Sequence, residues 1–389
     1  MSTIIDEHRE YLSDGPRLAA FRQAIGALVT PDSVVLDLGA GTGILGMLAC
    51  RAGAKRVYAV DEGGMIEVAR SLCEANGFTD RMRFIKGLST QVTLPEPVDL
   101  VVADQIGHFG FEAGICEYFR DARARFLKPH GRMIPGRIDL HVAPVEHQAL
   151  RNQVDFWQQT PQEAPIEFDL SPVHLSALNS GYPAKLQPDH LLGPSVMAVS
   201  FDPSEAPEPL RFRTELTVGR PGLLHGIGGW FVAQLAPGVT LSNSPLFAQR
   251  INRRNVFFPI ARQVPVEKDE RIDLSMTVLP SQTLVSWKVQ VWRAESPTQP
   301  GPRTILAESS HSTMQGLLLS REDLERTRPD FVPRLTPWGE ARQTVLACCD
   351  GSLPLAAIEQ EVLRRHPDLF PNLAVASAFV AEVVIRYSR

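Results

Sequence analysis

Short apolar runs alternate with helical patterns along the first third of the chain, from about residue 33 to residue 140. The apolar runs predict buried strands over 33–38, 56–60, 82–86 and 98–103. Between and after them, apolar positions at helical spacing predict helices over 44–53, 65–76 and 113–127, the last ending at a Lys-Pro-His-Gly turn over 128–131. This alternation predicts β-α-β units and therefore a Rossmann-like α/β domain.

The pattern changes beyond about residue 138, where apolar and polar positions alternate. Such alternation predicts half-buried antiparallel strands over 210–218, 229–235, 272–278 and 284–292. Proline and glycine separate these segments, and the prolines of 296–303 predict a loop. Together these features predict an antiparallel β-barrel or sandwich.

Amphipathic helices are predicted at the end of the chain, over 336–347, 355–366 and 375–387, with an Asp350-Gly351 turn after the first. The chain is therefore expected to contain three domains. They are a Rossmann-like domain with N-terminal helices (1–137), a β-barrel domain (138–330) and a small α-helical module (331–389).

Composition excludes several functions for the 389-residue chain. Its formal net charge of −5 argues against a binder of nucleic-acid backbones, which usually carries a basic domain. The five cysteines form no Cys-x-x-Cys pair, so no metal site is expected, and reduced thiols point to the cytoplasm. The first residues have neither the basic nor the apolar region of a signal peptide, so none is expected, and no apolar run reaches the roughly 18 residues of a membrane span.

A glycine run marks the first candidate site, where Gly39, Gly41 and Gly43 follow Asp37 between a predicted strand and a predicted helix. Glycines let the backbone approach a ligand closely, and a helix N-terminus offers it free N–H groups. The Gly-x-Gly-x-Gly spacing differs from the Gly-x-Gly-x-x-Gly of dinucleotide binders. A tight strand–helix turn alone would also require glycine.

Asp61 adds a second signal at the end of the next predicted strand. An acidic side chain at that point can accept hydrogen bonds from both ribose hydroxyls. The alternative is an exposed acid stabilised by a helix N-terminus. Because both signals are in register, the sequence predicts a nucleoside-binding site.

The glycine run, the Ile44-Leu45 pair and the stretch 52–60 resemble the protein arginine methyltransferases, as do 7–14 and 17–22. The resemblance continues in order through Gly229-Trp230-Phe231 and through Leu-Ser-Asn-Ser-Pro at 241–245, and it covers about 6 to 292. It implies a class I methyltransferase that uses S-adenosylmethionine and releases S-adenosylhomocysteine. It also implies a homodimer, with a dimerisation arm matching 154–178.

The resemblance also implies cofactor contacts. Arg17 would hold the methionine carboxylate, while His8 and Tyr11 would close over the cofactor; a solvated helix charge is the alternative for Arg17. The adenine-contacting glutamate of the family is missing at 88–91. The implied set is His8, Tyr11, Arg17, Asp37, Gly39, Gly41, Gly43, Ile44, Leu45, Asp61, Glu62, Leu88 and Ser89.

The acceptor loop over 103–114 departs from the family. Arginine methyltransferases hold the substrate guanidinium between two glutamates, because this group stays charged and must be aimed by carboxylates. Asp104 matches the first glutamate, Ala113 matches the second, and Gln105 replaces the usual tryptophan. Glu112 would take the second role only if the loop slipped by one residue.

Asp104, His108 and Glu112 are the catalytic candidates. Asp104 follows a parallel strand, at the edge of the sheet where such folds bind their ligands. His108 could act as a general base toward a hydroxyl, amine or ring nitrogen, or could be a hydrogen-bonded hairpin residue.

A second departure lies at 250–252, where Arg-Ile-Asn replaces the family's Thr-His-Trp. Arg250, Arg253 and Arg254 would disfavour a guanidinium and favour an anionic acceptor, unless they only line a solvated turn. A protein or peptide arginine and a small molecule or natural-product peptide therefore both remain open as acceptors. A non-catalytic cofactor-binding module is the alternative from another class. The C-terminal module loosely resembles PqqD-type winged helices, which bind leader peptides; a helical cap packed against the barrel is the alternative.

Overall fold

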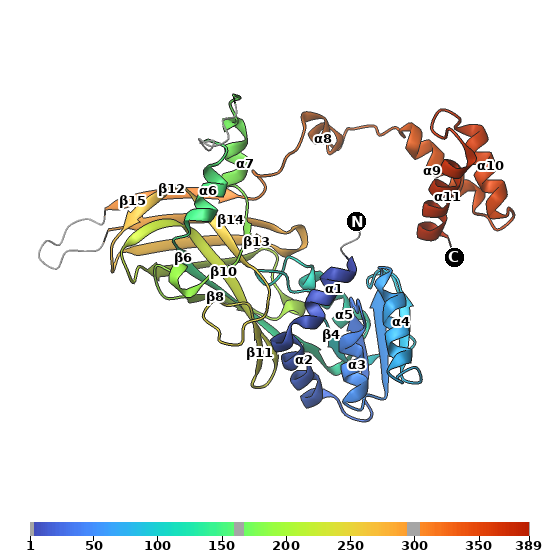
Figure 1. Cartoon of the computed structure of the whole chain (residues 1–389), viewed down its shortest axis with the longest axis horizontal. Helices are drawn as coiled ribbons and strands as arrows, with labels where there is room; N and C mark the ends of the chain where they lie inside the picture. The colour runs from blue at the N-terminus through green and yellow to red at the C-terminus, as the bar shows by residue number, and fades with distance from the viewer. Residues whose placement is uncertain (1–3, 159–166, 294–303, 389) are drawn as a thin grey trace, which may run out of the picture. The chain divides into compact units, whose positions relative to one another are not determined.

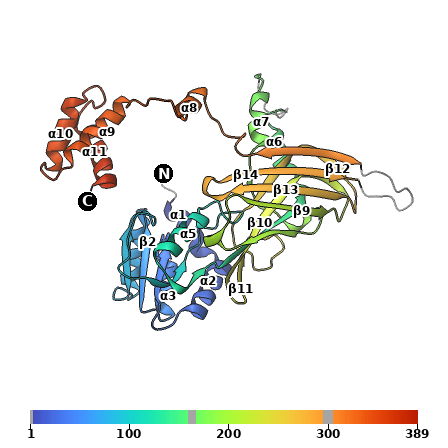
Figure 2. The same ribbon diagram turned by 180° about the vertical axis from the view of Figure 1, so that it is seen from behind.

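The computed structural model describes residues 4–158, 167–293 and 304–388 and divides into two compact units, Met1–Leu317 and Leu318–Arg389. The first unit begins with helices α1 (Ile4–Ser13) and α2 (Gly15–Leu28). Both views show α2 beside α3 (Ile44–Arg51) and β11 (Val239–Ser242) (Figures 1 and 2). The N-terminal helices therefore contact both the α/β part and the barrel part of this unit.

A five-stranded parallel sheet follows, in the order β3-β2-β1-β4-β5. All five residues of the central strand β1 (Val34–Leu38) are buried, as expected for a parallel sheet covered on both faces. Strand order reverses at β1, so a ligand crevice is expected at its carboxyl end. The other elements are β2 (Arg56–Asp61), α4 (Met65–Ala75), β3 (Met82–Lys86), β4 (Val98–Val102), α5 (Ile115–Arg125) and β5 (Leu127–Ile134). The predicted Rossmann-like domain is confirmed.

The turn predicted over 128–131 is wrong, because these residues lie inside β5. On the facing strand, Val98 pairs with Leu127, whereas Leu100 pairs with Arg132. The intervening residues of β5 thus form an irregularity within a strand, where Lys128 Nζ donates to both Asp99 carboxylate oxygens at 2.8 Å. The proline and glycine therefore disturb the local pairing without ending the strand.

Two antiparallel sheets form the barrel part. One has the order β7-β12-β10-β6-β8 with β11 paired to β10, and the other has the order β15-β14-β13-β9. The strands are β6 (Arg137–Val145), β7 (Tyr182–Ala184), β8 (Val196–Phe201), β9 (Leu210–Thr217), β10 (Gly222–Ala236), β12 (Asn255–Val266), β13 (Arg271–Leu279), β14 (Leu284–Trp292) and β15 (Ile305–Ser312). Helices α6 (Gln148–Asp155) and α7 (His174–Leu178) lie on either side of residues 159–166 of the predicted arm, which are outside the described residues. The loop predicted over 296–303 also lies outside them.

One hydrophobic core joins the α/β part to the barrel. The Phe109 ring, on the loop after β4, lies edge-on to Phe258 of β12 with 5.5 Å between centroids. Trp287 of β14 packs on the same Phe258 ring and donates its indole N–H to the Pro259 carbonyl at 2.8 Å. The loop after β4 is therefore anchored in the barrel, which determines where its polar residues lie.

The second unit contains α8 (Arg321–Arg326), α9 (Pro337–Cys348), α10 (Leu355–Arg365) and α11 (Leu373–Tyr387). The last three helices share a small core that includes Val345, Val362 and Val380. The three predicted helices are confirmed, and the part of this unit that the structure describes contains no strand. Its likeness to PqqD-type modules stays a prediction. None of the described helices is long and apolar enough to cross a membrane.

Candidate active site

The glycine turn after β1 forms one wall of the site. Gly39 and Gly41 have φ values of +66° and +53°, a region that side chains rarely adopt. A Cβ on Gly41 would lie 2.6 Å from Cε1 of His8. The turn therefore requires glycine for its backbone shape and for the close approach of α1.

Two aspartates hold this turn in place. Asp61 accepts hydrogen bonds from Gly41 N at 2.8 Å and Gly63 N at 2.7 Å, one through each carboxylate oxygen. Asp37 is fully buried and accepts from Gly46 N at 2.7 Å, in the first turn of α3. Burial raises the pKa of Asp37 to about 7. Asp37 lies beneath the turn, whereas Asp61 lies at its rim with a lone pair left on each oxygen.

A cavity of about 210 Å³ opens beside the turn, and we call it the cofactor cavity. Seven of the predicted cofactor residues line it together: His8, Tyr11, Arg17, Gly39, Gly41, Ile44 and Leu45. Asp104, Gln105 and Ala113 complete the wall on the acceptor side. The helices α1 and α2, the turn after β1 and the loop after β4 thus meet at the switch point of the sheet.

The remaining predicted cofactor residues are not among the residues that line this cavity, and neither are Asp37 and Asp61. Gly43 is the N-cap of α3, with a φ of +70°. Glu62 is exposed next to Asp61. Ser89 is buried after β3, and its carbonyl accepts from Arg125 Nη2 at 2.5 Å, while the carbonyl of the preceding Leu88 accepts from Gln91 N at 2.8 Å.

Asp104 lies between two arginines. Arg17 Nε donates to Asp104 Oδ2 at 2.5 Å, and Arg253 donates through Nη1 to Oδ1 at 3.1 Å and through Nη2 to Oδ2 at 2.9 Å. All three side chains are at most 11% exposed. Burial alone would raise the pKa of Asp104, but Arg253 and Arg17 hold it below its ordinary value. The guanidinium groups of Arg17 and Arg253 therefore already bind the carboxylate of Asp104, the residue that matches the family's first glutamate.

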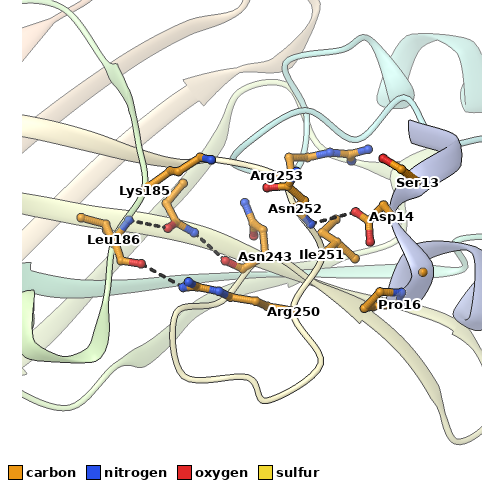
Figure 3. Close-up of a pocket in the computed structure, with 12 residues that line it drawn as sticks. Ser13, Asp14, Pro16, Lys185, Leu186, Asn243, Arg250, Ile251, Asn252 and Arg253 are labelled. Atoms are coloured by element: carbon orange, nitrogen blue, oxygen red, sulfur yellow. Dashed lines mark hydrogen bonds between the residues drawn. The ribbon is translucent and has the colours of Figure 1, made fainter. Parts of the chain in front are cut away.

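A second cavity of about 280 Å³ lies on the other side of Arg253, and we call it the arginine-loop cavity. Figure 3 shows Lys185, Arg250 and Arg253 around it, facing Asp14 at the start of α2. Asp14 accepts from Asn252 N at 2.8 Å and from Arg17 N at 3.2 Å. This one carboxylate thus ties the loop over 250–254 to the helix that carries Arg17.

Asn243 holds the acceptor loop to the barrel. It is buried, and its Nδ2 donates to the carbonyls of His108 and Arg254 at 2.7 Å each, while Oδ1 accepts from Phe231 N at 3.0 Å. Sequence reasoning found the motif around Asn243 but missed this role, and it missed Asp14 altogether. The N-cap signal of an aspartate just before a Gly-Pro helix start could have identified Asp14.

Glu112 and His108 lie outside both cavities. The Glu112 carboxylate turns back on its own loop and accepts from Phe109 N at 2.8 and 2.9 Å and from Phe111 N at 3.2 Å. Burial raises the pKa of Glu112. Burial and Arg253 lower the pKa of His108, whose Nδ1 is buried without a partner in the described part of the chain. Ala113, at the second glutamate position, is the residue that lines the cofactor cavity.

Two family models match the chain. Residues 21–153 match the ribosomal protein L11 methyltransferase (PrmA) family, and residues 137–290 match the arginine methyltransferase oligomerization subdomain. The two matches coincide with the α/β part and most of the barrel part. Neither covers the second unit.

Curated relatives are arginine methyltransferases. The chain is 29% identical over 257 residues to the histone-arginine methyltransferase CARMER of Drosophila mojavensis, covering 62% of this chain and 47% of the relative. It is 28% identical over 286 residues to protein arginine N-methyltransferase 6 of Xenopus laevis, covering 70% of this chain and 84% of the relative. The chain thus spans about half the length of the CARMER relatives that it matches.

Solved structures share the fold. A chain of the Trypanosoma brucei PRMT1 enzyme-prozyme complex with AdoHcy has a TM-score of 0.69 at 22% identity, covering 80% of this chain and 99% of that one. Arabidopsis thaliana protein arginine methyltransferase 10 has a TM-score of 0.67 at 22% identity, covering 79% and 97%. By sequence and fold together, the chain resembles the protein arginine methyltransferases: its α/β part matches a methyltransferase family, its barrel part matches their oligomerization subdomain, and it shares their fold.

Proposed function

We propose that the chain transfers the methyl group of S-adenosylmethionine to an acceptor that is not a guanidinium. One observation carries this proposal: both oxygens of Asp104 are already bound by Arg253, and one of them also by Arg17. A substrate arginine would have to displace the buried bidentate ion pair between Arg253 and Asp104. It would also bring a third guanidinium to a carboxylate that two arginines already surround.

The residues around the cofactor cavity suit the donor. Gly41 leaves space that a Cβ would fill, Asp61 keeps acceptor sites at the rim, and Arg17 Nη2 has no partner among the described residues. Arg17 would hold the methionine carboxylate, and Asp61 would hold the ribose. S-adenosylmethionine, when bound, supplies an electrophilic methyl group on a sulfonium sulfur.

The acceptor wall favours a neutral or anionic acceptor. Ala113 provides no carboxylate where the family's second glutamate would stand, so a cation would find no free negative group on that wall. The role we propose for Asp104 is to hold the Arg253 guanidinium in place at the boundary of the two cavities. We assign Glu112 to the shape of the loop, because its carboxylate binds backbone N–H groups of that loop.

His108 is our candidate base for an acceptor that carries an acidic proton. Its lowered pKa favours the neutral imidazole at pH 7, which is the form that can accept a proton. A shift of the loop would be needed to bring its free ring nitrogen to the cavity. Substitution by glutamine, read as a change in the pH profile of turnover, tests this role.

The direct test is transfer of labelled methyl from S-adenosylmethionine into a host lysate, followed by separation by size and by acid hydrolysis of the protein fraction. We expect label in small molecules and no methylarginine. Methylarginine in the protein fraction would contradict the proposal. Tight binding of S-adenosylhomocysteine without transfer to any fraction would support the non-catalytic alternative.

We also propose a homodimer. The oligomerization subdomain match spans 137–290, which includes α6 and α7 of the predicted arm. Leu175 of α7 is 63% exposed, as expected for a side chain that a second copy would cover. Sedimentation velocity on the wild type and Leu175→Glu tests this assembly, with exposed Met197→Glu as the matched control. A cytoplasmic location remains a prediction.

A further inference from the structure

We propose that the arginine-loop cavity binds an anionic group, a carboxylate or a phosphate, of a small acceptor molecule. This inference rests on the proposed function and names the class of acceptor. The cavity of about 280 Å³ is lined by Lys185, Arg250 and Arg253 on one side and by Asp14 and the start of α2 on the other (Figure 3).

Two positive charges in this cavity have no carboxylate partner in the described structure. Arg250 donates to the Leu186 carbonyl and to Gln187 Oε1, both at 3.0 Å, and both acceptors are neutral. Lys185 is exposed and makes no hydrogen bond or ion pair with the described residues. Two uncompensated cations that line one cavity attract an anion to it, and the partly buried Arg250 is less screened by solvent than a fully exposed charge.

The nearby carboxylates are already engaged. Asp14 is bound by two backbone N–H groups, and Asp104 is bound by Arg17 and Arg253. The charged side chains lining the two cavities, apart from histidine, comprise four cations (Arg17, Lys185, Arg250, Arg253) and these two aspartates. The excess is therefore two positive charges, which a monoanionic or dianionic group would balance.

Residues that line the arginine-loop cavity also contact residues that line the cofactor cavity. Arg253 lines the arginine-loop cavity and contacts Asp104, which lines the cofactor cavity. Asp14 makes a second connection, because it lines the first cavity and accepts from the backbone of Arg17. An acceptor with its anionic group on Lys185 and Arg250 would therefore extend its reactive end toward Arg253 and the cofactor cavity.

The binding test uses the whole chain loaded with S-adenosylhomocysteine and two probes, inorganic phosphate and acetate. Each probe replaces chloride at constant ionic strength while the thermal midpoint and the heat of binding are measured. We expect at least one probe to bind the wild type. The K185Q/R250Q double variant should bind that probe about tenfold more weakly or worse, because a charge-assisted contact is lost.

R262Q is the matched control. Arg262 lies on β12, is exposed, and lines neither cavity, so R262Q removes a positive charge elsewhere on the barrel and matches the R250Q half of the double variant. We expect R262Q to bind the probes within twofold of the wild type. An equal loss in R262Q and in the double variant, or no binding of either probe to the wild type, would overturn the inference. Unchanged affinity for S-adenosylhomocysteine verifies that the double variant is folded. The single variant K185Q is a further check, because Lys185 makes no hydrogen bond or ion pair with the described residues and its replacement breaks no such contact.

The product test separates this inference from the proposed function. The labelled small-molecule product should bind an anion-exchange resin, and its release after phosphatase treatment would distinguish a phosphate from a carboxylate. A labelled product that carries no negative charge would overturn the inference while methyl transfer still stood. Probe binding that depends on Lys185 and Arg250 without any methyl transfer would retain the anion site and refute the proposed function.

Discussion

The Arg253 guanidinium holds both carboxylate oxygens of Asp104, at 3.1 Å for Nη1–Oδ1 and 2.9 Å for Nη2–Oδ2. The two residues are 149 positions apart in the chain, one after a strand of the parallel sheet and one in a loop of the barrel. Because Arg17 binds the same carboxylate, the N-terminal helices, the sheet and the barrel meet at one buried ion cluster.

Removing Arg253 should lower the free energy of unfolding and leave one side of the Asp104 carboxylate without a partner. Loss of one partner from a buried ion pair costs roughly 3–5 kcal/mol, and we expect the lower end for R253A because Arg17 remains. We also expect R253A to lose turnover, because Arg253 separates the two cavities and fixes Asp104. Added guanidinium at millimolar concentration should restore part of this turnover, since it can occupy the vacated position. R254A, which removes an exposed arginine next to it, is the control. Equal stability and turnover in both variants would contradict the structural role of the pair.

Replacing Glu112 should affect folding more than cofactor binding. The Glu112 carboxylate accepts from Phe109 N and Phe111 N, whereas the amide of E112Q has only one oxygen that can accept. We expect this loss to lower the free energy of unfolding by about 1–3 kcal/mol. Affinity for S-adenosylhomocysteine, measured by titration calorimetry, should stay within twofold. E117Q on α5 removes an exposed charge and should change neither value. A turnover defect in E112Q with full stability would assign Glu112 to the chemistry instead.

Asp37 should make stability depend on pH. Its pKa of about 7 in the folded chain lies above the ordinary value of 3.8, so the folded state holds a proton that the unfolded state has released. The stability contributed by this proton is complete below about pH 4 and is lost as the pH rises through 7. From pH 5 to pH 8 the wild type should lose about 2–3 kcal/mol more than D37N. Urea unfolding at both pH values measures this difference, and D32N at an exposed position should behave like the wild type.

Gly41 should be required for cofactor binding. An alanine there would need a φ of +53°, and its Cβ would lie 2.6 Å from the His8 ring. The strained φ would distort the turn, and relief of the clash would turn the His8 ring away, so G41A should bind S-adenosylhomocysteine at least tenfold more weakly, a loss of about 1.4 kcal/mol. G26A is the control, because nothing lies within 4 Å of the added methyl group. Equal affinities in the two variants would show that the closeness of His8 to the turn is unimportant.

Local patterns in the sequence predicted most of the α/β part. The strands around the glycine run were found because they are buried on both faces and bounded by glycine, so their identity depends on neighbouring residues alone. The segment 128–131 was predicted wrongly, since pairing with β4 keeps it in a strand despite its turn residues. Strand β12 was missed because an interior Pro259 and Pro265 hide its alternation, and pairing with β10 and β7 is what places it in a sheet.

The sequence by itself determined the glycine turn and the place of Asp61, because these act through short-range backbone geometry that their order along the chain already encodes. The role predicted for Arg17 came from the family resemblance. Only the tertiary structure decided the acceptor side. Nothing in the local sequence around Asp104 reveals that Arg253 occupies its carboxylate, or that Glu112 turns to its own loop and leaves Ala113 at the cavity. The physical reason is that a buried charge must find its partner in space, and here the partner comes from a barrel loop whose position depends on the packing of the whole first unit.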